Sequence, residues 1–373
     1  MPSLNNNQQA LFALLKAGLW EQEVSLFQFE KIDFTEVYRL AEEQSVLGLA
    51  TAGLDHVADI IVPKEIVLQF VGNALQLEQR NKAMNTFVGS LINKTRAKDI
   101  YTLLVKGQGI AQCYERPSWR ASGDVDLLLS EDNYIKAIDY LKSQASRIDE
   151  ENPKHRHLAL NIGPWVVELH GTLHSGLWHR LDKTLDQVQN EVFRDGQVRS
   201  WMNGNTQIFL PRADEDIVFV FAHVLQHFFQ EGVGLRQICD WCRLLWTYRE
   251  QIDLSLLIER LKSMGVMSEW KSFAAFAVNT LGMPEEAMPF YSSDYRWKRN
   301  AKRITDFVLE TGNFGHNRDY SYYEKYPYFV YKMISLGRHT LDGLRYLPIF
   351  PIDSIKVWWC MIRTGAAKAV KGK

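Results

Sequence analysis

The amino-acid sequence predicts an α+β fold in which a small mixed β-sheet with helices lies between two helical lobes. Apolar residues recur at helical spacing through residues 1–95. From about residue 100 they form short runs bounded by glycine and proline, as strands do. After Pro211 the helical spacing returns. We therefore expect an N-terminal helical lobe at 1–95, an α/β core at 96–212 and a C-terminal helical lobe at 213–373.

The N-terminal lobe is expected to contain successive amphipathic helices. Residues 8–20 have apolar side chains at helical spacing, with an end near Gly18. Asp33 lies three residues before Glu36, much as in a capping box, and predicts a helix that continues to residue 54. Pro63 then introduces a long helical segment that has no internal proline. This lobe carries no chemical motif of its own.

The central region is predicted to alternate strands and helices. Residues 100–105 and 125–129 are short buried-strand candidates, each followed by a helical pattern. Residues 155–162 and 165–173 alternate on either side of Gly163-Pro164, as the two arms of a hairpin do. The order strand, helix, strand, helix, strand, strand indicates a mixed sheet with helices on one side.

Composition and charge exclude several classes of function. The formal net charge of −1 gives no global electrostatic reason to expect a nucleic-acid partner. Four cysteines in 373 residues are too few for a disulfide framework. The N-terminus lacks the features of a signal peptide, and no run of about 18 apolar residues could span a membrane. We expect a soluble cytoplasmic protein of undetermined oligomeric state.

The chemistry is expected on two strands of the central region. Asp124 and Asp126 alternate with Val125, so both carboxylates point to one face of their strand. Adjacent carboxylates repel each other unless a cation compensates them, and oxygen ligands suit Mg²⁺. Glu168 lies among apolar residues of another strand, where an uncompensated carboxylate would be costly to bury. If the two strands are neighbours, the three carboxylates can hold two Mg²⁺ ions.

Residues close to these acids are candidates for binding phosphate groups. Backbone N–H groups at the start of a helix attract anions, and cationic side chains neutralise them. A glycine-rich turn follows the first strand, and His170 shares a strand face with Glu168. The candidates are Lys106, Gly107, Gln108, Gly109, Arg120 and His170.

Together these motifs resemble the nucleotidyltransferase fold of the DNA polymerase beta-like superfamily. The sequence is most similar to a bacterial group described as uncharacterised nucleotidyltransferases, often found beside polysaccharide-assembly genes. The resemblance covers roughly residues 30–260, and Gln108 separates two glycines where the superfamily usually has Gly-Gly or Gly-Ser. It rests on Lys106-Gly107…Tyr114…Pro117…Arg120…Gly123-Asp124-x-Asp126, on Glu168-x-His170 and on His223…His227…Gly234-Leu-Arg236…Asp240.

The resemblance implies a reaction and roles for these residues. The enzyme would transfer a nucleoside monophosphate from an NTP to an acceptor hydroxyl or phosphate, in polysaccharide assembly. Asp124, Asp126 and Glu168 would bind Mg²⁺, and Asp240 could act as general base or acceptor ligand. The acceptor and the preferred base stay open. Two alternatives are a catalytically weak binding or scaffold module with the same fold, and a metal-dependent phosphoester hydrolase.

Some candidates also have a purely structural explanation. Asp124 and Asp126 could lie at a solvated strand end, and Glu168 and Asp240 could form ion pairs. The ion pairs considered are Glu168 with Arg120 or Arg156, and Asp240 with Arg236 or Arg243.

The remaining histidines, cysteines and aromatic residues favour packing. His170 and His174 lie four residues apart on a strand, too far apart to share one metal ion easily. Cys239-Asp-Trp-Cys242 lies within an amphipathic helical pattern with no preceding strand, which is not the context of a redox pair. From Tyr320 the chain is aromatic and basic, and this segment could contact an anionic membrane surface.

Overall fold

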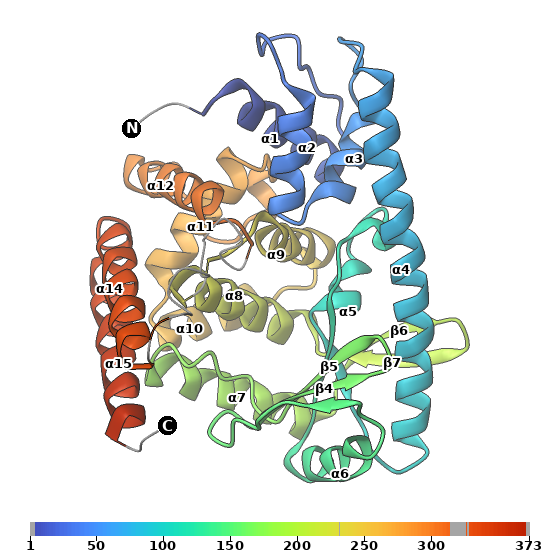
Figure 1. The fold of residues 1–373 in the computed structure, drawn as a ribbon, viewed down its shortest axis with the longest axis vertical. Coiled ribbons are helices and arrows are strands. Elements are labelled where there is room, and N and C mark those ends of the chain that lie inside the picture. The colour runs from blue at the N-terminus through green and yellow to red at the C-terminus, as the bar shows by residue number, and fades with distance from the viewer. Residues whose placement is uncertain (1–3, 231, 314–325, 327, 371–373) are drawn as a thin grey trace.

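The computed structural model describes residues 4–230, 232–313, 326 and 328–370, and it contains a mixed sheet surrounded by helices (Figure 1). The five strands have the order β1-β2-β5-β4-β3. β2 and β5 are parallel, whereas the β1–β2, β4–β5 and β3–β4 pairs are antiparallel. This confirms the predicted α+β class with a small mixed sheet. The strands are β1 (Leu103–Val105), β2 (Asp124–Leu128), β3 (Arg147–Ile148), β4 (His157–Ile162) and β5 (Trp165–His170).

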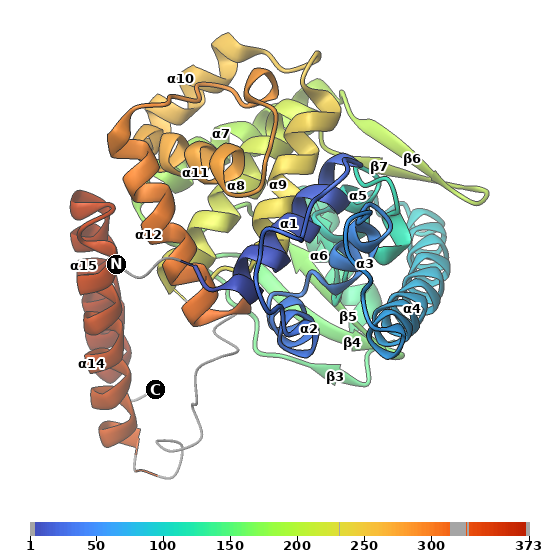
Figure 2. The same ribbon diagram turned by 90° about the horizontal axis from the view of Figure 1, so that it is seen from above.

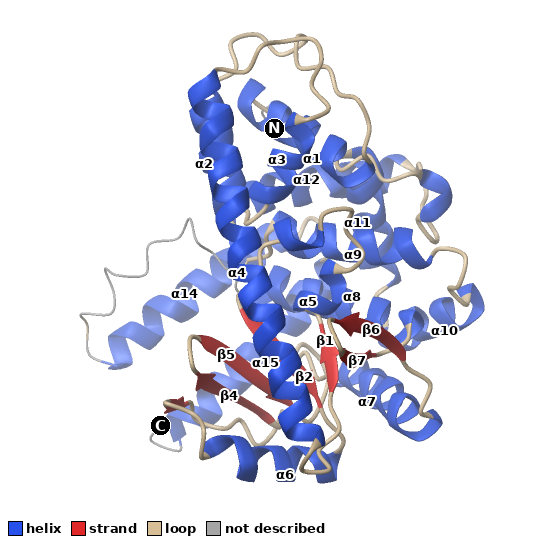
Figure 3. Cartoon of the chain, turned by 90° about the vertical axis from the view of Figure 1, so that its right-hand side faces the viewer, coloured by secondary structure: helices blue, strands red, loops and turns tan. Residues whose placement is uncertain are grey.

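One face of the sheet is apolar and packs against α4 (Lys64–Arg96) and α6 (Glu131–Lys142). Val125 and Val167, which are partners across β2 and β5, belong to this buried cluster. Figure 3 shows α4 crossing in front of the strands. Because side chains alternate along a strand, the residues between these valines and leucines point to the opposite face. That opposite face carries the polar residues.

The N-terminal region forms α1 (Asn6–Trp20), α2 (Phe34–Glu43) and α3 (Leu47–Leu54). The prediction of one helix continuing to residue 54 is therefore wrong. The helix breaks because Ser45 adopts a φ of 55°, in the left-handed region. Gln44 beside it is buried and bonds the Val308 carbonyl and the Leu235 backbone N–H. The break thus joins the N-terminal helices to the C-terminal ones.

The C-terminal part is helical, as predicted, but residues 171–212 contain elements that the sequence analysis did not assign. These are α7 and a separate β6–β7 hairpin. From residue 171 to the C-terminal end, the longer elements are α7 (His179–Asp195), β6 (Arg199–Asn203), β7 (Thr206–Leu210), α8 (Ala213–Gln230), α9 (Leu235–Tyr248), α10 (Leu254–Met264), α11 (Met267–Asn279), α12 (Tyr295–Thr311), α14 (Tyr328–Tyr346) and α15 (Pro351–Val370). The short helical segments are α5 (Gly107–Ala111), η1 (Pro117–Trp119) and η2 (Glu285–Ala287).

The helices before and after the sheet share one apolar cluster, which runs from α1 to α15. Trp20 at the end of α1 donates a hydrogen bond from Nε1 to the Leu281 carbonyl, at 2.7 Å. Because this core is continuous, the boundaries expected at residues 95 and 212 stay a prediction.

The α14–α15 pair lies at the edge of the molecule (Figure 2). Its outward side chains include Leu341, Leu344, Ile352 and Trp359, all exposed. Among the described residues, none of the helices combines the length and apolar character that crossing a membrane requires. The start of the segment expected at a membrane surface, residues 320–325, lies outside the described residues, and membrane contact stays a prediction.

Helices α1 and α3 approach each other closely at two glycines. A Cβ added to Gly18 would lie 2.2 Å from the Leu49 carbonyl oxygen, and one added to Gly53 would lie 2.0 Å from the Leu14 carbonyl oxygen. Both obstacles are backbone atoms, so a side chain could be accommodated only by separating the helices. Gly72 in α4 has no atom within 4 Å of its added Cβ.

Substituting Gly53→Ala should therefore lower the free energy of unfolding by about 1–3 kcal/mol, because overpacking moves the backbone. Gly72→Ala should raise it by about 0.5–1 kcal/mol, since alanine favours a helix more than glycine does. Denaturant unfolding of both variants measures the difference. Equal stabilities would contradict the close approach of α1 and α3.

Candidate active site

The parallel pairing of β2 with β5 brings three carboxylates together on the polar face of the sheet. Asp126 is the register partner of Glu168, and Asp124 lies two residues before Asp126 on the same strand face. One oxygen from each of the three carboxylates lies within 4.8 Å of the others. The two strands are neighbours, as the sequence hypothesis required. An oxygen-only donor set of this kind fits Mg²⁺.

Mutual repulsion acts on these acids. The neighbouring Asp126 carboxylate, with burial as the second cause, raises the pKa of Asp124 above its ordinary value, although Lys106 opposes the shift. A divalent cation between the oxygens would relieve this repulsion. The three carboxylates therefore form a site that suits Mg²⁺.

Lys106 supplies a positive charge at the end of β1. Its backbone has a φ of 55°, and its side chain places Nζ 2.7 Å from Asp126 Oδ1. Burial disfavours the charged ammonium, but the carboxylates of Asp126, Glu168 and Asp124 outweigh it and raise the pKa of Lys106. Lys106 therefore stays protonated within the carboxylate cluster.

Two histidines flank Glu168. His157 Nε2 lies 3.2 Å and His170 Nε2 lies 3.4 Å from Glu168 Oε2, and His170 Nε2 also lies 2.8 Å from Asp126 Oδ1. Burial would raise the pKa of Glu168, but hydrogen bonds from His157 and His170 outweigh burial and hold it far below its ordinary value. The two arginines considered as partners of Glu168 form other ion pairs. Arg156 pairs with Glu131 at 2.7 Å, and Arg120 pairs with Asp240.

Arg120 forms a buried ion pair with Asp240 of α9. Its Nε lies 3.0 Å from Asp240 Oδ1, and its Nη2 lies 2.5 Å from Oδ2, so both carboxylate oxygens are bonded. Tyr114 Oη donates a further hydrogen bond to Oδ1 at 2.8 Å. Arg236 donates a hydrogen bond from Nη1 to the Ala121 carbonyl at 3.0 Å, and Arg243 bonds the Cys113 carbonyl and the Glu115 carboxylate.

A pocket of about 440 Å³, open to solvent, lies beside these groups. Residues of the β1–α5 turn, β2, α8 and α9 form its walls, so it brings together groups that are far apart in the chain. Burial, followed by the charge of Lys106, lowers the pKa of His223 in its wall well below the ordinary value. The lining includes Lys106, Gly107, Arg120, Asp124, Asp126, His223, Arg236, Gln237 and Asp240.

Gln108 and Gly109 pack away from this pocket. Gln108 is buried, and its Nε2 donates to Asn81 Oδ1 of α4 at 3.0 Å. A Cβ on Gly109 would lie 2.8 Å from Leu210 Cδ2 of β7, so this glycine allows α5 to approach the hairpin. The residue that departs from the usual glycine pattern thus anchors the turn to α4. A phosphate-binding role for these two residues stays a prediction.

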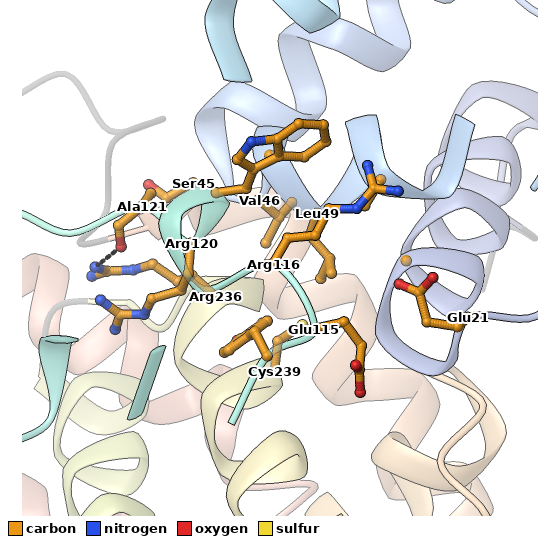
Figure 4. Close-up of a pocket in the computed structure, with 15 residues that line it drawn as sticks. Glu21, Ser45, Val46, Leu49, Glu115, Arg116, Arg120, Ala121, Arg236 and Cys239 are labelled. Carbon is orange, nitrogen blue, oxygen red and sulfur yellow. Dashed lines mark hydrogen bonds between the residues drawn. The ribbon is translucent and has the colours of Figure 1, made fainter. Parts of the chain in front are cut away.

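A second recess, of about 420 Å³, lies on the other side of Arg120 and Arg236. Figure 4 shows these two side chains next to each other at one end and Glu21 at the other. Val46, between α2 and α3, and Leu49 of α3 form part of its wall. Both arginines line the first pocket too, so the two spaces adjoin at the guanidinium groups.

Cys239 and Cys242 are buried free thiols in α9. Burial raises the pKa of each above its ordinary value, so neither is a reactive thiolate. The expectation that this pair has a packing role is confirmed.

A small mixed sheet with carboxylates on adjacent parallel strands, beside a pocket to which Lys106, Arg120 and Arg236 contribute, is the arrangement expected of the nucleotidyltransferases that the sequence motifs resemble. Residues 30–282, more than half of the 373-residue chain, match the family described as "Uncharacterised nucleotidyltransferase". The chain belongs to this family. Comparison with curated proteins and with solved structures gives no match.

His157 was not predicted from the sequence as a residue of the site. The signal that could have found it is the hairpin register, because a turn at Gly163-Pro164 places His157 opposite His170. Tyr114 was noted only as part of a motif, since its bond to Asp240 spans 126 residues of chain.

The Arg120–Asp240 pair can be tested through stability. Asp240→Asn should lower the free energy of unfolding by about 3–5 kcal/mol, because it leaves the Arg120 guanidinium buried without its counter-ion. Tyr114→Phe, which removes only a neutral donor to the same carboxylate, should cost about 1 kcal/mol. Denaturant unfolding compares them, and equal losses would contradict a buried charge pair.

Proposed function

We propose that this protein is a Mg²⁺-dependent nucleotidyltransferase that moves a nucleoside monophosphate from an NTP to an acceptor hydroxyl or phosphate and releases pyrophosphate. The observation that carries the proposal is the group of Asp124, Asp126 and Glu168, from each of which one carboxylate oxygen lies within 4.8 Å of the others. The adjoining pocket is lined by Lys106 and two arginines, which suits a triphosphate.

Each part of the site would have a distinct task. Asp124, Asp126 and Glu168 would hold Mg²⁺, which neutralises triphosphate charge and polarises the α-phosphate when bound. Lys106 and Arg236 would bind phosphate oxygens. Asp240 would orient Arg120 rather than act as base, since both its oxygens are already bonded. Catalysis would depend on positioning and charge neutralisation.

The bond changes are those of transfer at phosphorus. The acceptor oxygen forms a bond to the α-phosphorus, and the bond between that phosphorus and the α,β-bridging oxygen breaks. Pyrophosphate leaves with the electron pair, and the acceptor proton passes to water. The hydrogen bonds from His157 and His170 keep Glu168 ionised, as a metal ligand must be.

Asp124→Asn should separate activity from stability. The variant should lose at least about 10³-fold in transfer, as expected for loss of an essential charge-stabilising group. It should unfold at the same temperature or slightly higher, because the repulsion that raises the pKa of Asp124 disappears. Asp139→Asn, on an exposed position of α6, should change neither.

The assay supplies each of four NTPs with Mg²⁺ and a deproteinised cell extract as the source of acceptors, with products resolved by mass spectrometry. Pyrophosphate together with a nucleotidylated product is the expected result. Inorganic phosphate without such a product would favour the hydrolase, and absence of Mg²⁺-dependent NTP binding would favour the scaffold.

We further propose that the recess of Figure 4 receives the acceptor, in the form of a small phosphorylated molecule such as a sugar phosphate. Its walls combine the apolar Val46 and Leu49 with guanidinium groups at the inner end. Arg120, which lines both spaces, would hold the acceptor phosphate beside the NTP pocket. An acceptor of this class would suit polysaccharide assembly.

Leu49→Trp should fill this recess. We expect loss of labelled product from α-³²P-NTP and the extract, with Mg²⁺-dependent NTP binding unchanged. Leu75→Trp, at an exposed position of α4, is the matched control and should retain both. Undiminished labelling by Leu49→Trp would exclude the recess as the acceptor site.

A further inference from the structure

We infer that His157, Glu168 and His170 form a second metal site, which takes a divalent ion that accepts imidazole ligands, such as Mn²⁺ or Co²⁺. Only a catalytic role for this ion rests on the proposed function, because metal binding itself can be measured without nucleotide. It adds nitrogen donors to a site for which the acids alone indicate Mg²⁺.

The sheet register creates this donor set. β4 and β5 are antiparallel, and His157 is the register partner of His170, so the two imidazoles share the polar face. Their ring centroids are 4.9 Å apart. Glu168 lies two residues before His170, and one donor atom from each of the three residues lies within 4.8 Å of the others. Three donors from two strands therefore converge.

The residue types distinguish this set from the neighbouring one. Asp124, Asp126 and Glu168 offer only oxygens, which suit Mg²⁺, whereas imidazole nitrogen suits Mn²⁺, Co²⁺ and Zn²⁺ better. Glu168 belongs to both sets, so its carboxylate could bridge two ions. Along the sheet face, the donors change from oxygen on β2 to nitrogen on β4.

The site is accessible and its donors can be released for a metal. The His157 side chain is 36% exposed, which gives an ion a path from solvent. Three protein donors leave coordination positions for water or a phosphate oxygen. His170 Nε2 now lies 2.8 Å from Asp126 Oδ1, and a bound ion would replace this hydrogen bond with a coordinate bond. Metal binding requires neutral imidazole and should therefore weaken at acidic pH.

Two histidines close to His157 and His170 in the chain do not take part. His174 Nε2 lies 2.6 Å from Asp186 Oδ1, so this ring is directed to α7. His155 contacts the His174 ring edge to face, at 5.9 Å between centroids. The histidines thus combine across two strands rather than along one, and His155 provides a control.

The test uses the full-length protein with one equivalent of Mn²⁺ and an excess of Mg²⁺, which competes for the oxygen-only set. Pulsed electron paramagnetic resonance detects ¹⁴N coupling when an imidazole nitrogen coordinates Mn²⁺. We expect this coupling in the wild type, its reduction in His157→Gln and its retention in His155→Gln. Calorimetry should show Mn²⁺ affinity falling by about tenfold or more in His157→Gln, with Mg²⁺ affinity unchanged.

Absence of ¹⁴N coupling in the wild type, or wild-type Mn²⁺ affinity in His157→Gln, would overturn the inference. If the protein transfers nucleotide with Mg²⁺ but shows no ¹⁴N coupling, the proposed function is supported and the second metal site is rejected. Coupling in a protein that transfers no nucleotide would leave the metal site standing and reject the transferase.

Discussion

The parallel pairing of β2 with β5 is the constraint on which the site depends. This pairing sets Asp126 opposite Glu168 and places like charges side by side on one face of the sheet. Such an arrangement is unfavourable in isolation, because each carboxylate disfavours ionisation of the next. The groups around it supply compensation, through the ammonium of Lys106 and the imidazoles of His157 and His170. The opposite face is apolar and fixes the register through α4 and α6.

The Arg120–Asp240 pair connects this sheet to the helices that follow it. Arg120 precedes β2, and Asp240 belongs to α9, so the pair joins segments 120 residues apart. A buried ion pair contributes little net stability compared with apolar packing, but it specifies one geometry for both side chains. That geometry places the Arg120 guanidinium where the carboxylate pocket adjoins the recess against the N-terminal helices. The helical regions on both sides of the sheet thus help to shape the site.

Local patterns in the sequence were sufficient for the fold class and for the acids. Alternation in Asp124-Val-Asp126 places both carboxylates on one face whatever the partner strand is. The turn at Gly163-Pro164 likewise fixes the β4–β5 hairpin, since Gly163 has a φ of 59° that favours glycine. These features depend on neighbours in the chain, which a sequence displays directly.

Features that depend on distant partners were not predictable in this way. At the break between α2 and α3, Gln44 bonds the Leu235 N–H and the Val308 carbonyl, which lie 191 and 264 positions away in the chain. Asp240 pairs with Arg120, a partner 120 residues away that local spacing could not indicate, because the tertiary fold brings that residue to α9. Gln108 departs from the usual glycine pattern of the phosphate loop, and only the structure shows its buried hydrogen bond to Asn81 of α4. In each case long-range packing, rather than local propensity, decides the contact.

The central claim is that the Asp124, Asp126 and Glu168 face binds the reacting phosphate through a metal. The most direct measurement is a crystal structure with Mg²⁺ and an NTP analogue whose α,β-bridging oxygen is replaced by a methylene group. We predict Mg²⁺ bound between these carboxylates, with the α-phosphate against it and the outer phosphates near Lys106 and Arg236. A nucleotide bound away from this face, or Mg²⁺ that contacts neither Asp124 nor Asp126, would contradict the account.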